Sequence, residues 1–295
     1  MIILISLFSF LILIFHHTNG QNSPNISMGS TFTAGNNSTL LSSSEDFAFG
    51  FYPVSDTLFL VGIRFNKIQE NTRLLVLNYV NGTVQQIYSG AASLGISQDD
   101  GNLALRDSRS NNVWEIFKFS TDTLLPGQTL LSAGKFYSNS NSSGNLKFST
   151  GKFMLEMQYD GKLVLSAYHF RVPRVLAESR NHYEVNLVFN KRNASLYLVK
   201  GTNNNTNYSF TSNVPSPVED YYHGATLDSF GNFQQYAYHK TNGRNWIRVW
   251  KIPSEPCMVN AVLGVYGFCS SNDNETVDCD RLPGYIFFDP SNPNN

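Results

Sequence analysis

The chain has 295 residues, of which 15% are charged, and its 21 basic and 22 acidic side chains leave a formal net charge of −1. This length can supply two domains with cores of their own. The near-neutral charge offers no electrostatic surface to nucleic acid or to an anionic membrane, so it excludes both as partners. With 22 phenylalanines, 15 tyrosines and many Asn-Ser-Thr-Gly clusters, the composition is typical of a β-rich protein with many turns.

The first 20 residues indicate export from the cell. Residues 2–15 form an apolar run, and Thr18 and Gly20 place small residues at the −3 and −1 positions of a cleavage site before Gln21. The run is too short to span a bilayer comfortably, so it predicts a secretory signal peptide over residues 1–20, with an uncleaved N-terminal anchor as the alternative. No other segment of the sequence approaches a transmembrane span, and we expect the mature chain to be extracellular.

Nine Asn-x-Ser/Thr triplets without proline support this compartment, because they are acceptors for N-linked glycans. They begin at Asn25, Asn36, Asn37, Asn81, Asn141, Asn193, Asn204, Asn207 and Asn274. Asn-rich sequences also produce such triplets by chance, and two of these overlap, so we expect about half of them to be used.

Strand patterns follow one another along the chain at a spacing of roughly ten residues. In the first half we predict strands within residues 45–53, 59–65, 74–80, 84–88, 102–106 and 113–117. After a loop closed by Pro126-Gly127 and a Ser/Asn/Gly-rich stretch, we predict strands at 152–158, 163–168, 183–190, 195–199, 224–228, 233–239 and 246–250. No helical period extends beyond two turns, and the predicted fold is therefore all-β.

One strand-turn-strand pattern is the main candidate for a binding site. It is clearest in Gln158-Tyr-Asp160-Gly-Lys162-Leu-Val164. In an extended strand these four numbered side chains would project from one face of a sheet. Polar groups beside an aliphatic group would hydrogen-bond the hydroxyls of a sugar and pack against its C–H face. A related copy contains Gln98, Asp100 and Asn102, and a looser echo runs from Leu227 through Asp228 to Phe233.

Several segments together resemble the extracellular part of plant bulb-type lectin receptor-like kinases, also called G-type or S-domain receptors. The resemblance runs from about Gln21 to Pro290. It rests on the segments at residues 46–52, 59–65, 101–107, 113–117, 121–128 and 149–165. It implies tandem β-prism domains, each built from three small sheets about a pseudo-threefold axis, at residues 21–130 and 131–255. It also implies an extracellular location in the apoplast.

In related bulb lectins a Gln-x-Asp-x-Asn-x-Val-x-Tyr strand binds mannose, and the resemblance carries that role to the two copies only in part. In the later copy Gln158, Asp160 and Val164 match, but Lys162 replaces Asn and Ser166 replaces Tyr. The earlier copy keeps Gln98, Asp100 and Asn102, but Ala104 and Arg106 replace Val and Tyr. A lysine donates hydrogen bonds but accepts none, so the pattern of an amide is lost there.

The region between Leu74 and Ser93 is shorter than the family pattern, which has a tryptophan-bearing strand and a further sugar motif there. We therefore expect the first prism to be incomplete by about one sheet. The loss of a sheet would expose the apolar face of its neighbours.

All three cysteines, Cys257, Cys269 and Cys279, lie in the last forty residues. Clustered cysteines in a secreted chain are typical of a small disulfide-supported module. The segment 256–295 resembles part of the EGF-like module of the receptor family, and this resemblance implies a disulfide between Cys257 and Cys269. Leu263 stands where the partner of Cys279 would be, so Cys279 is either free or bonded to another molecule. A frayed tail is the alternative for this segment.

The sequence contains no pattern that predicts catalysis or a cofactor. It has no Gly-rich phosphate loop, no His-Arg-Asp or Asp-Phe-Gly triplet and no His-Glu-x-x-His or Cys-x-x-Cys metal spacing. We therefore expect a non-enzyme without a metal, whose partners are mannose-type glycans. The alternatives are a protein-interaction module that pairs with receptor-like kinase ectodomains as a decoy or co-receptor, and a decayed gene copy without function.

Overall fold

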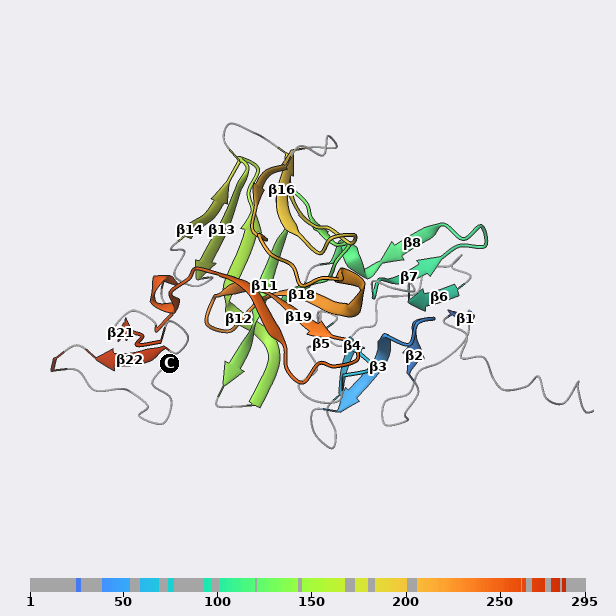
Figure 1. Cartoon of the computed structure of the whole chain (residues 1–295), viewed down its shortest axis with the longest axis horizontal. Helices are drawn as coiled ribbons and strands as arrows, with labels where there is room; N and C mark the ends of the chain where they lie inside the picture. Colours follow the sequence, from blue (N-terminus) through green and yellow to red (C-terminus); the bar gives the residue numbers. More distant parts are fainter. Residues whose placement is uncertain are drawn as a thin grey trace, which may run out of the picture.

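The computed structural model describes residues 25–27, 39–53, 59–68, 74–76, 93–96, 101–119, 121–142, 145–167, 173–179, 184–200, 206–260, 262–263, 267–273, 277–281 and 283–284 (Figure 1). These residues form antiparallel strands joined by turns, together with three short 3-10 helices. The predicted all-β class is confirmed. Among the described helices, none is long and apolar enough to cross a membrane.

The first domain contains two four-stranded sheets in the part of the chain that is described. One sheet has the order β1 (Asn25–Ser27), β6 (Ser93–Ile96), β7 (Leu103–Arg106) and β8 (Asn112–Glu115). The other has the order β2 (Leu40–Leu41), β3 (Phe47–Pro53), β4 (Phe59–Phe65) and β5 (Leu74–Val76). The helix η1 (Ile116–Lys118) follows β8. The strand predicted at 84–88 lies outside the described residues.

The second domain is built from three four-stranded sheets, as a β-prism requires. The first consists of β11 (Lys135–Ser142), β12 (Asn145–Met157), β13 (Lys162–Ala167) and β14 (Pro173–Glu178). The second has the order β10 (Thr129–Leu130), β15 (Val185–Phe189), β16 (Leu196–Lys200) and β17 (Thr206–Ser209). The third has the order β20 (Ile247–Ile252), β19 (Phe233–His239), β18 (Tyr221–Leu227) and β9 (Thr123–Leu124). Both β9 and β10 precede residue 131, so these sheets include strands from the span expected to belong to the first domain. The helix η2 (Val218–Asp220) precedes β18.

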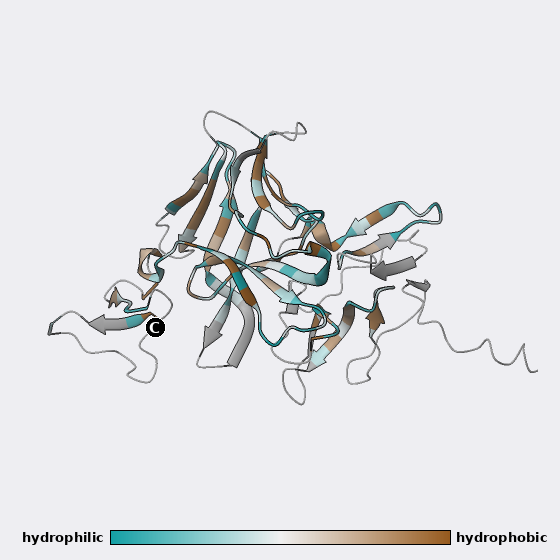
Figure 2. Cartoon of the chain, viewed as in Figure 1, coloured by the Kyte–Doolittle hydropathy of each residue, from teal (hydrophilic) through white to brown (hydrophobic). Residues whose placement is uncertain are grey.

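Alternating apolar residues from the three sheets meet in one core. In β15 the odd-numbered Val185, Leu187 and Phe189 are fully buried, while the residues between them are only partly covered. The same core takes in Phe136, Phe153 and Phe233, among others. Figure 2 shows brown apolar and teal polar residues side by side on the strands of this domain. The period-2 pattern of the sequence thus explains which face of each strand is buried.

A polar network is buried beside this core. The side-chain oxygen of Gln235, which is fully buried, accepts hydrogen bonds from the Thr211 hydroxyl at 2.8 Å and from the Trp250 indole at 2.6 Å. The Gln235 amide nitrogen donates to the Ala194 carbonyl at 2.7 Å. Because these groups satisfy one another, burial does not leave them unpaired, and the network fixes how β19 and β20 lie against the loop before β16.

The sheet that contains β18 serves both domains, one on each face. Leu227 and Ala225 of β18 belong to the core of the second domain, whereas Tyr222, which points to the opposite face, belongs to the core of the first. Tyr238 of β19 and the nearby Trp246 also pack against the first core. In Figure 1, β18 and β19 (orange) lie between the green and yellow strands of the second domain and the blue strands of the first.

A charged cluster reinforces this contact between the domains. Asp46, from the turn before β3, accepts a hydrogen bond from the Tyr222 hydroxyl at 2.8 Å. Its carboxylate also lies 2.8 Å from Lys67 and 3.7 Å from Lys240. Burial disfavours the ionised carboxylate, but the hydrogen bonds from Lys67 and Tyr222 outweigh that effect and lower the pKa of Asp46. The ring of Phe65 packs on Tyr222, with centroids 4.9 Å apart.

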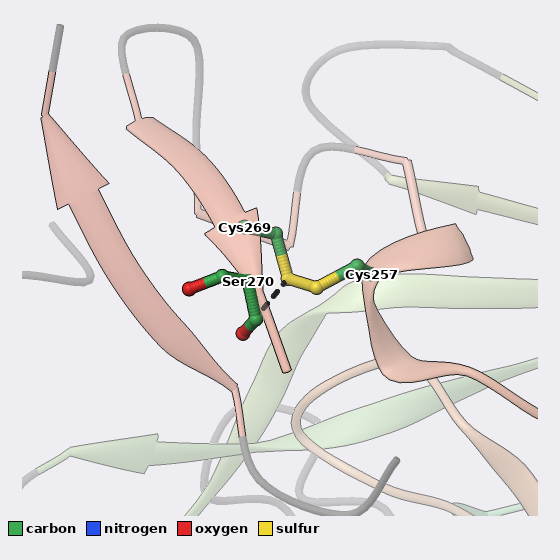
Figure 3. The surroundings of a disulfide bond; sticks show 3 residues. All are labelled: Cys257, Cys269 and Ser270. Atoms are coloured by element: carbon green, nitrogen blue, oxygen red, sulfur yellow. Dashed lines mark hydrogen bonds between the residues drawn. A yellow bond between two sulfur atoms is a disulfide. The ribbon is translucent and has the colours of Figure 1, made fainter. Parts of the chain in front are cut away.

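The cysteine segment packs on the second domain. It begins with the helix η3 (Pro256–Met258) and contains the hairpin of β21 (Gly267–Ser270) and β22 (Asp278–Arg281). Val259, Val262 and Leu263 are buried in the core of the second domain. A disulfide joins Cys257 to Cys269, the pair implied by the resemblance (Figure 3). Leu263, where the resemblance would place a cysteine, is therefore used for packing.

Candidate functional site

Three hairpin turns correspond to the three copies of the pattern found in the sequence. The strands on either side are paired in each case, β6 with β7, β12 with β13 and β18 with β19. Each turn contains a glycine with positive φ, which an L-residue rarely adopts: Gly101 at 77°, Gly161 at 85° and Gly231 at 85°. The Asp-Gly and Gly-Asn steps of the sequence therefore mark turns.

The turn at 158–161 agrees with the predicted break between the strands at 152–158 and 163–168, but it corrects the expectation that four side chains of this segment project from one face. β12 ends at Met157 and β13 begins at Lys162, so Gln158 and Asp160 belong to the turn. The Gln158 backbone N–H donates to the Lys162 carbonyl at 2.8 Å, and the Gly161 N–H donates to the Gln158 carbonyl at 3.1 Å. The side chains of Gln158, Asp160, Lys162 and Val164 therefore do not follow the simple alternation that would place them in one row.

Val164 departs furthest from its expected role. It lies on the inner strand β13, paired with Glu156 on one side and Val175 on the other, and only 2% of its surface is exposed. Its neighbours Leu163 and Leu165 are buried as well. The side chain thus contributes to packing and offers almost no apolar surface to a ligand in solution.

Asp160 and Lys162 form an ion pair at the rim of the turn, with 2.7 Å between the Lys162 ammonium and one Asp160 carboxylate oxygen. Their side chains are 46% and 33% exposed. The hydrogen bond from Lys162 lowers the pKa of Asp160, and the same contact raises the pKa of Lys162, so both groups are charged near neutral pH. The pair presents a carboxylate acceptor and an ammonium donor side by side.

In the earlier copy, the side-chain amide of Asn102 already forms hydrogen bonds within the protein. Its amide nitrogen donates to the Glu115 carboxylate at 3.0 Å, and its side-chain oxygen accepts from the Phe117 N–H at 3.2 Å. The amide therefore connects the start of β7 to β8 and η1. Gln98 and Asp100, the other predicted residues of this copy, lie outside the described residues.

The third copy is also used internally. The carboxylate of Asp228 accepts from the backbone N–H groups of Phe230 at 2.9 Å and Asn232 at 2.8 Å, and from the side-chain amides of Asn232 and Gln234. Four donors on one carboxylate leave it little capacity for a ligand. Of the two turns whose aspartate is described, the one at 158–161 presents the carboxylate with fewer contacts.

A tyrosine that the sequence pattern did not single out lies between the two predicted residues of this turn. Tyr159 is 70% exposed, the largest exposure among the large hydrophobic residues that the structure places on its surface. Aromatic side chains provide a rigid apolar face with a polar tip. One feature of the sequence indicated that Tyr159 is exposed, namely its position at the tip of a predicted tight turn.

The described residues contain no cluster of three or more His, Cys, Asp or Glu side chains that could hold a metal ion. Of the two described histidines, His223 in β18 is buried, with 4% of its surface exposed. Burial lowers its pKa to about 4, although its Nε2 lies 3.3 Å from the Val218 carbonyl oxygen. His223 is therefore neutral at physiological pH and belongs to the packing of the second domain. His169 and His182 lie outside the described residues.

Comparison with known proteins gives one family model and several related receptor kinases. Residues 180–288 match the S-locus glycoprotein domain. The chain is similar to G-type lectin S-receptor-like serine/threonine-protein kinases of Oryza sativa: it is 29% identical to LECRK4 of subsp. indica, over 96% of this chain and 40% of the relative. The values for LECRK1 of the same subspecies are 28%, 96% and 41%. Receptor-like serine/threonine-protein kinase SD1-8 of Arabidopsis thaliana is 23% identical over 91% of this chain.

The chain is thus related to the S-domain lectin receptor kinases, and the resemblance noted in its sequence is confirmed. It spans about 40% of the length of these rice relatives. The alignment with LECRK4 has 336 positions although this chain has 295 residues, so the relative carries additional segments within the aligned span.

Proposed function

We propose that this protein is a secreted, non-enzymatic glycoprotein that recognises carbohydrate, with mannose-type glycans as the first class to test. The observation that supports the proposal most directly is the exposed turn of the second domain, where the Asp160–Lys162 pair lies beside Tyr159. A sugar hydroxyl would donate to the carboxylate and accept from the ammonium, while the tyrosine ring would cover a C–H face of the sugar.

Because Val164 is buried, it cannot supply the apolar contact with a sugar. In the family pattern an aliphatic residue supplies the apolar contact, but here that contact falls to Tyr159. A shallow site of this kind makes few hydrogen bonds, each of which contributes about 1 kcal/mol, so we expect a dissociation constant on the order of 1 mM. Recognition at the cell surface would then depend on several ligands being presented together.

The test is binding of the purified secreted chain to mannose-agarose and to a glycan array. Asp160→Ala and Tyr159→Ala should each abolish retention, whereas Tyr159→Phe, which keeps the ring, should retain it. Asp107→Ala is the matched control, because Asp107 is a partly exposed aspartate that closes the turn after β7 in the first domain. Absence of binding by a folded chain, or equal loss in the Asp107 variant, would exclude this site.

Lys162→Asn provides a gain-of-function arm. The substitution restores the amide of the family pattern and releases the Asp160 carboxylate from its ion pair. One recovered hydrogen bond of about 1 kcal/mol corresponds to roughly fivefold tighter binding. Weaker binding by this variant would show that the Lys162 ammonium contributes more than the family amide, and unchanged binding would show that the two side chains are equivalent here.

A second candidate function is a protein-interaction module that pairs with receptor-like kinase ectodomains as a decoy or co-receptor. It is favoured by the occupied Asn102 and Asp228 side chains, which make the other two turns scaffold. Capture of a recombinant LECRK4 ectodomain by the chain, unaffected by Asp160→Ala and by free mannose, would support it. The decayed-copy alternative predicts poor secretion and no cooperative melting transition.

Glycosylation forms part of the same proposal. Among the predicted acceptors, Asn193 lies in the exposed turn between β15 and β16, and the Ser195 hydroxyl of its triplet donates to the Asn193 side-chain oxygen at 2.7 Å. Asn25, Asn141 and Asn207 lie on strands β1, β11 and β17. Asn36, Asn37, Asn81, Asn204 and Asn274 lie outside the described residues. Treatment with peptide N-glycosidase should convert Asn193 to aspartate, which mass spectrometry detects.

A further inference from the structure

The hairpin of β21 and β22 brings the third cysteine next to the disulfide. The strands pair with Gly267 opposite Arg281 and Ser270 opposite Asp278, so Cys269 lies directly opposite Cys279. Cys269 is also the residue bonded to Cys257, with 5.3 Å between their Cα atoms (Figure 3). Cys269 therefore has two cysteine neighbours, one on η3 and one on the partner strand.

Both neighbours meet the backbone requirement for a bond to Cys269. Directly opposed residues of an antiparallel pair have Cα atoms about 4.5 or 5.5 Å apart, according to the class of pair. Disulfides form at Cα separations of about 4.4–6.8 Å, so either class is suitable. The chain has only three cysteines, and once two are joined the third has no cysteine left within the chain. The register thus places the remaining residue, Cys279, beside the bonded one.

We propose that Cys257, Cys269 and Cys279 form a disulfide-exchange site in which Cys269 is bonded to Cys257 or to Cys279. In the exchange the Cys279 thiolate attacks the Cys269 sulfur, an S–S bond forms between them, and Cys257 leaves as a thiolate that takes up a proton. One disulfide and one thiol are present before and after, so the step needs no oxidant or reductant.

The loops closed by the two bonds are nearly equal in length. Cys257 and Cys269 are 12 residues apart, and Cys269 and Cys279 are separated by ten. Because loop-closure entropy changes slowly with length, it favours neither isomer strongly, and packing decides between them. In the disulfide that forms here, Cys269 packs against the core of the second domain. Its sulfur lies 4.0 Å from the Ser270 carbonyl oxygen (Figure 3).

The two isomers differ in what they hold together. The Cys257–Cys269 bond attaches the hairpin to η3, in which Pro256 is buried and which leads directly to Val259 in the core of the second domain. A Cys269–Cys279 bond would join the two strands of the hairpin to each other and release η3. Exchange would therefore convert a covalent attachment between the lectin domain and the hairpin into a bond within the hairpin.

The experiment maps the free thiol in the purified secreted chain. Aliquots held at pH 6 and pH 8 are quenched with acid, labelled with N-ethylmaleimide and digested with chymotrypsin and Glu-C, which cut on either side of Cys269. We expect label on both Cys279 and Cys257. The rate at which this mixture forms should be roughly a hundredfold higher at pH 8 than at pH 6, because the thiolate fraction of an ordinary cysteine rises tenfold per pH unit below about 8.5. Label on Cys279 alone at both pH values would overturn the proposal.

Variants give a second readout. Cys257→Ser should form the Cys269–Cys279 bond and carry no free thiol, and Cys279→Ser should keep the Cys257–Cys269 bond. The control Cys269→Ser removes the shared partner and should leave two thiols that label. Two labelled thiols in Cys257→Ser, or a disulfide-linked dimer through Cys279 in the unaltered chain, would contradict an exchange within one chain.

Discussion

The two domains differ in how they enclose their cores. The second domain packs three four-stranded sheets around its own apolar residues. The first packs the residues of two described sheets and completes its core with Tyr222, Tyr238 and Trp246 from the second. The dependence is therefore unequal: among the described residues, the first core takes in side chains from the third sheet of the second domain, whereas the second core is completed by its own sheets and by Val259, Val262 and Leu263 of the cysteine segment.

The largest effect is expected where one strand serves both cores. Phe233 of β19 is fully buried and packs against the rings of Phe136 and Trp250. Phe233→Ala should cost about 3–5 kcal/mol of unfolding free energy. Because β19 also carries Tyr238 into the first core, both domains should lose stability in urea unfolding followed by hydrogen exchange.

The matched variant is Phe47→Ala, which removes a buried ring from the first domain. Exchange should then rise over residues 39–119, while the second domain keeps its protection. If Phe47→Ala raised hydrogen exchange in the second domain as much as in the first, the dependence between the domains would be mutual.

Acid should weaken the second domain through His223, with the next largest effect. Its pKa is about 4 in the folded chain, lowered by burial, against about 6.5 in an unfolded one. The unfolded state therefore binds the proton first, and the free energy of unfolding falls as the pH drops from about 6.5 to 4. The full difference corresponds to about 3 kcal/mol.

Urea unfolding of the unaltered chain and of His223→Gln at pH 7 and pH 4 measures this term. The variant should lose less stability between the two pH values, because glutamine does not titrate. Equal acid sensitivity of the two proteins would show that His223 is not buried in its neutral form.

A smaller effect is expected at the contact between the domains. Tyr222→Phe keeps the ring on Phe65 but removes the hydroxyl that donates to Asp46. A buried carboxylate that loses one hydrogen bond should cost about 1–2 kcal/mol, and only the first domain should show it. Tyr238→Phe is the control, because its hydroxyl donates to the Gly243 carbonyl within the second domain.

The smallest effect concerns the candidate site itself. Lys162→Gln removes an exposed ion pair with Asp160, and exposed pairs contribute little to stability. We expect a melting temperature indistinguishable from that of the unaltered chain in calorimetry. A clear decrease would mean that this turn supports the second domain, and any loss of sugar binding in its variants would have to be attributed to folding.

The sequence predicted the strands and the turns well, because their signals are local. The pattern at 233–239 coincides with β19, and Asp160-Gly161 marks a turn with positive φ. It failed for the orientation of particular side chains. The burial of Val164 depends on Glu156 and Val175 across two strand pairs, and the occupation of Asn102 depends on Glu115 from another strand. Such contacts are formed by tertiary packing, which a local pattern does not contain.

The contact between the domains could not be predicted from the sequence for the same reason. The predicted gap between Leu74 and Ser93 suggested an exposed apolar face on the first domain, and residues 77–92 lie outside the described part. That prediction therefore stays untested, but Tyr222, more than a hundred residues further along the chain, does belong to the core of the first domain. No periodicity within either segment indicates that they meet.

Leu124 and Leu125 are consecutive in the chain and both are fully buried, the first in the core of the second domain and the second in the core of the first. One peptide bond thus connects two hydrophobic anchors, and a hinge at this point would have to pull a leucine into water, at about 2 kcal/mol or more. We therefore expect the junction to be rigid, so that binding surfaces on the two domains keep a fixed spacing. A ligand that contacts both domains would then lose no free energy to reorienting them.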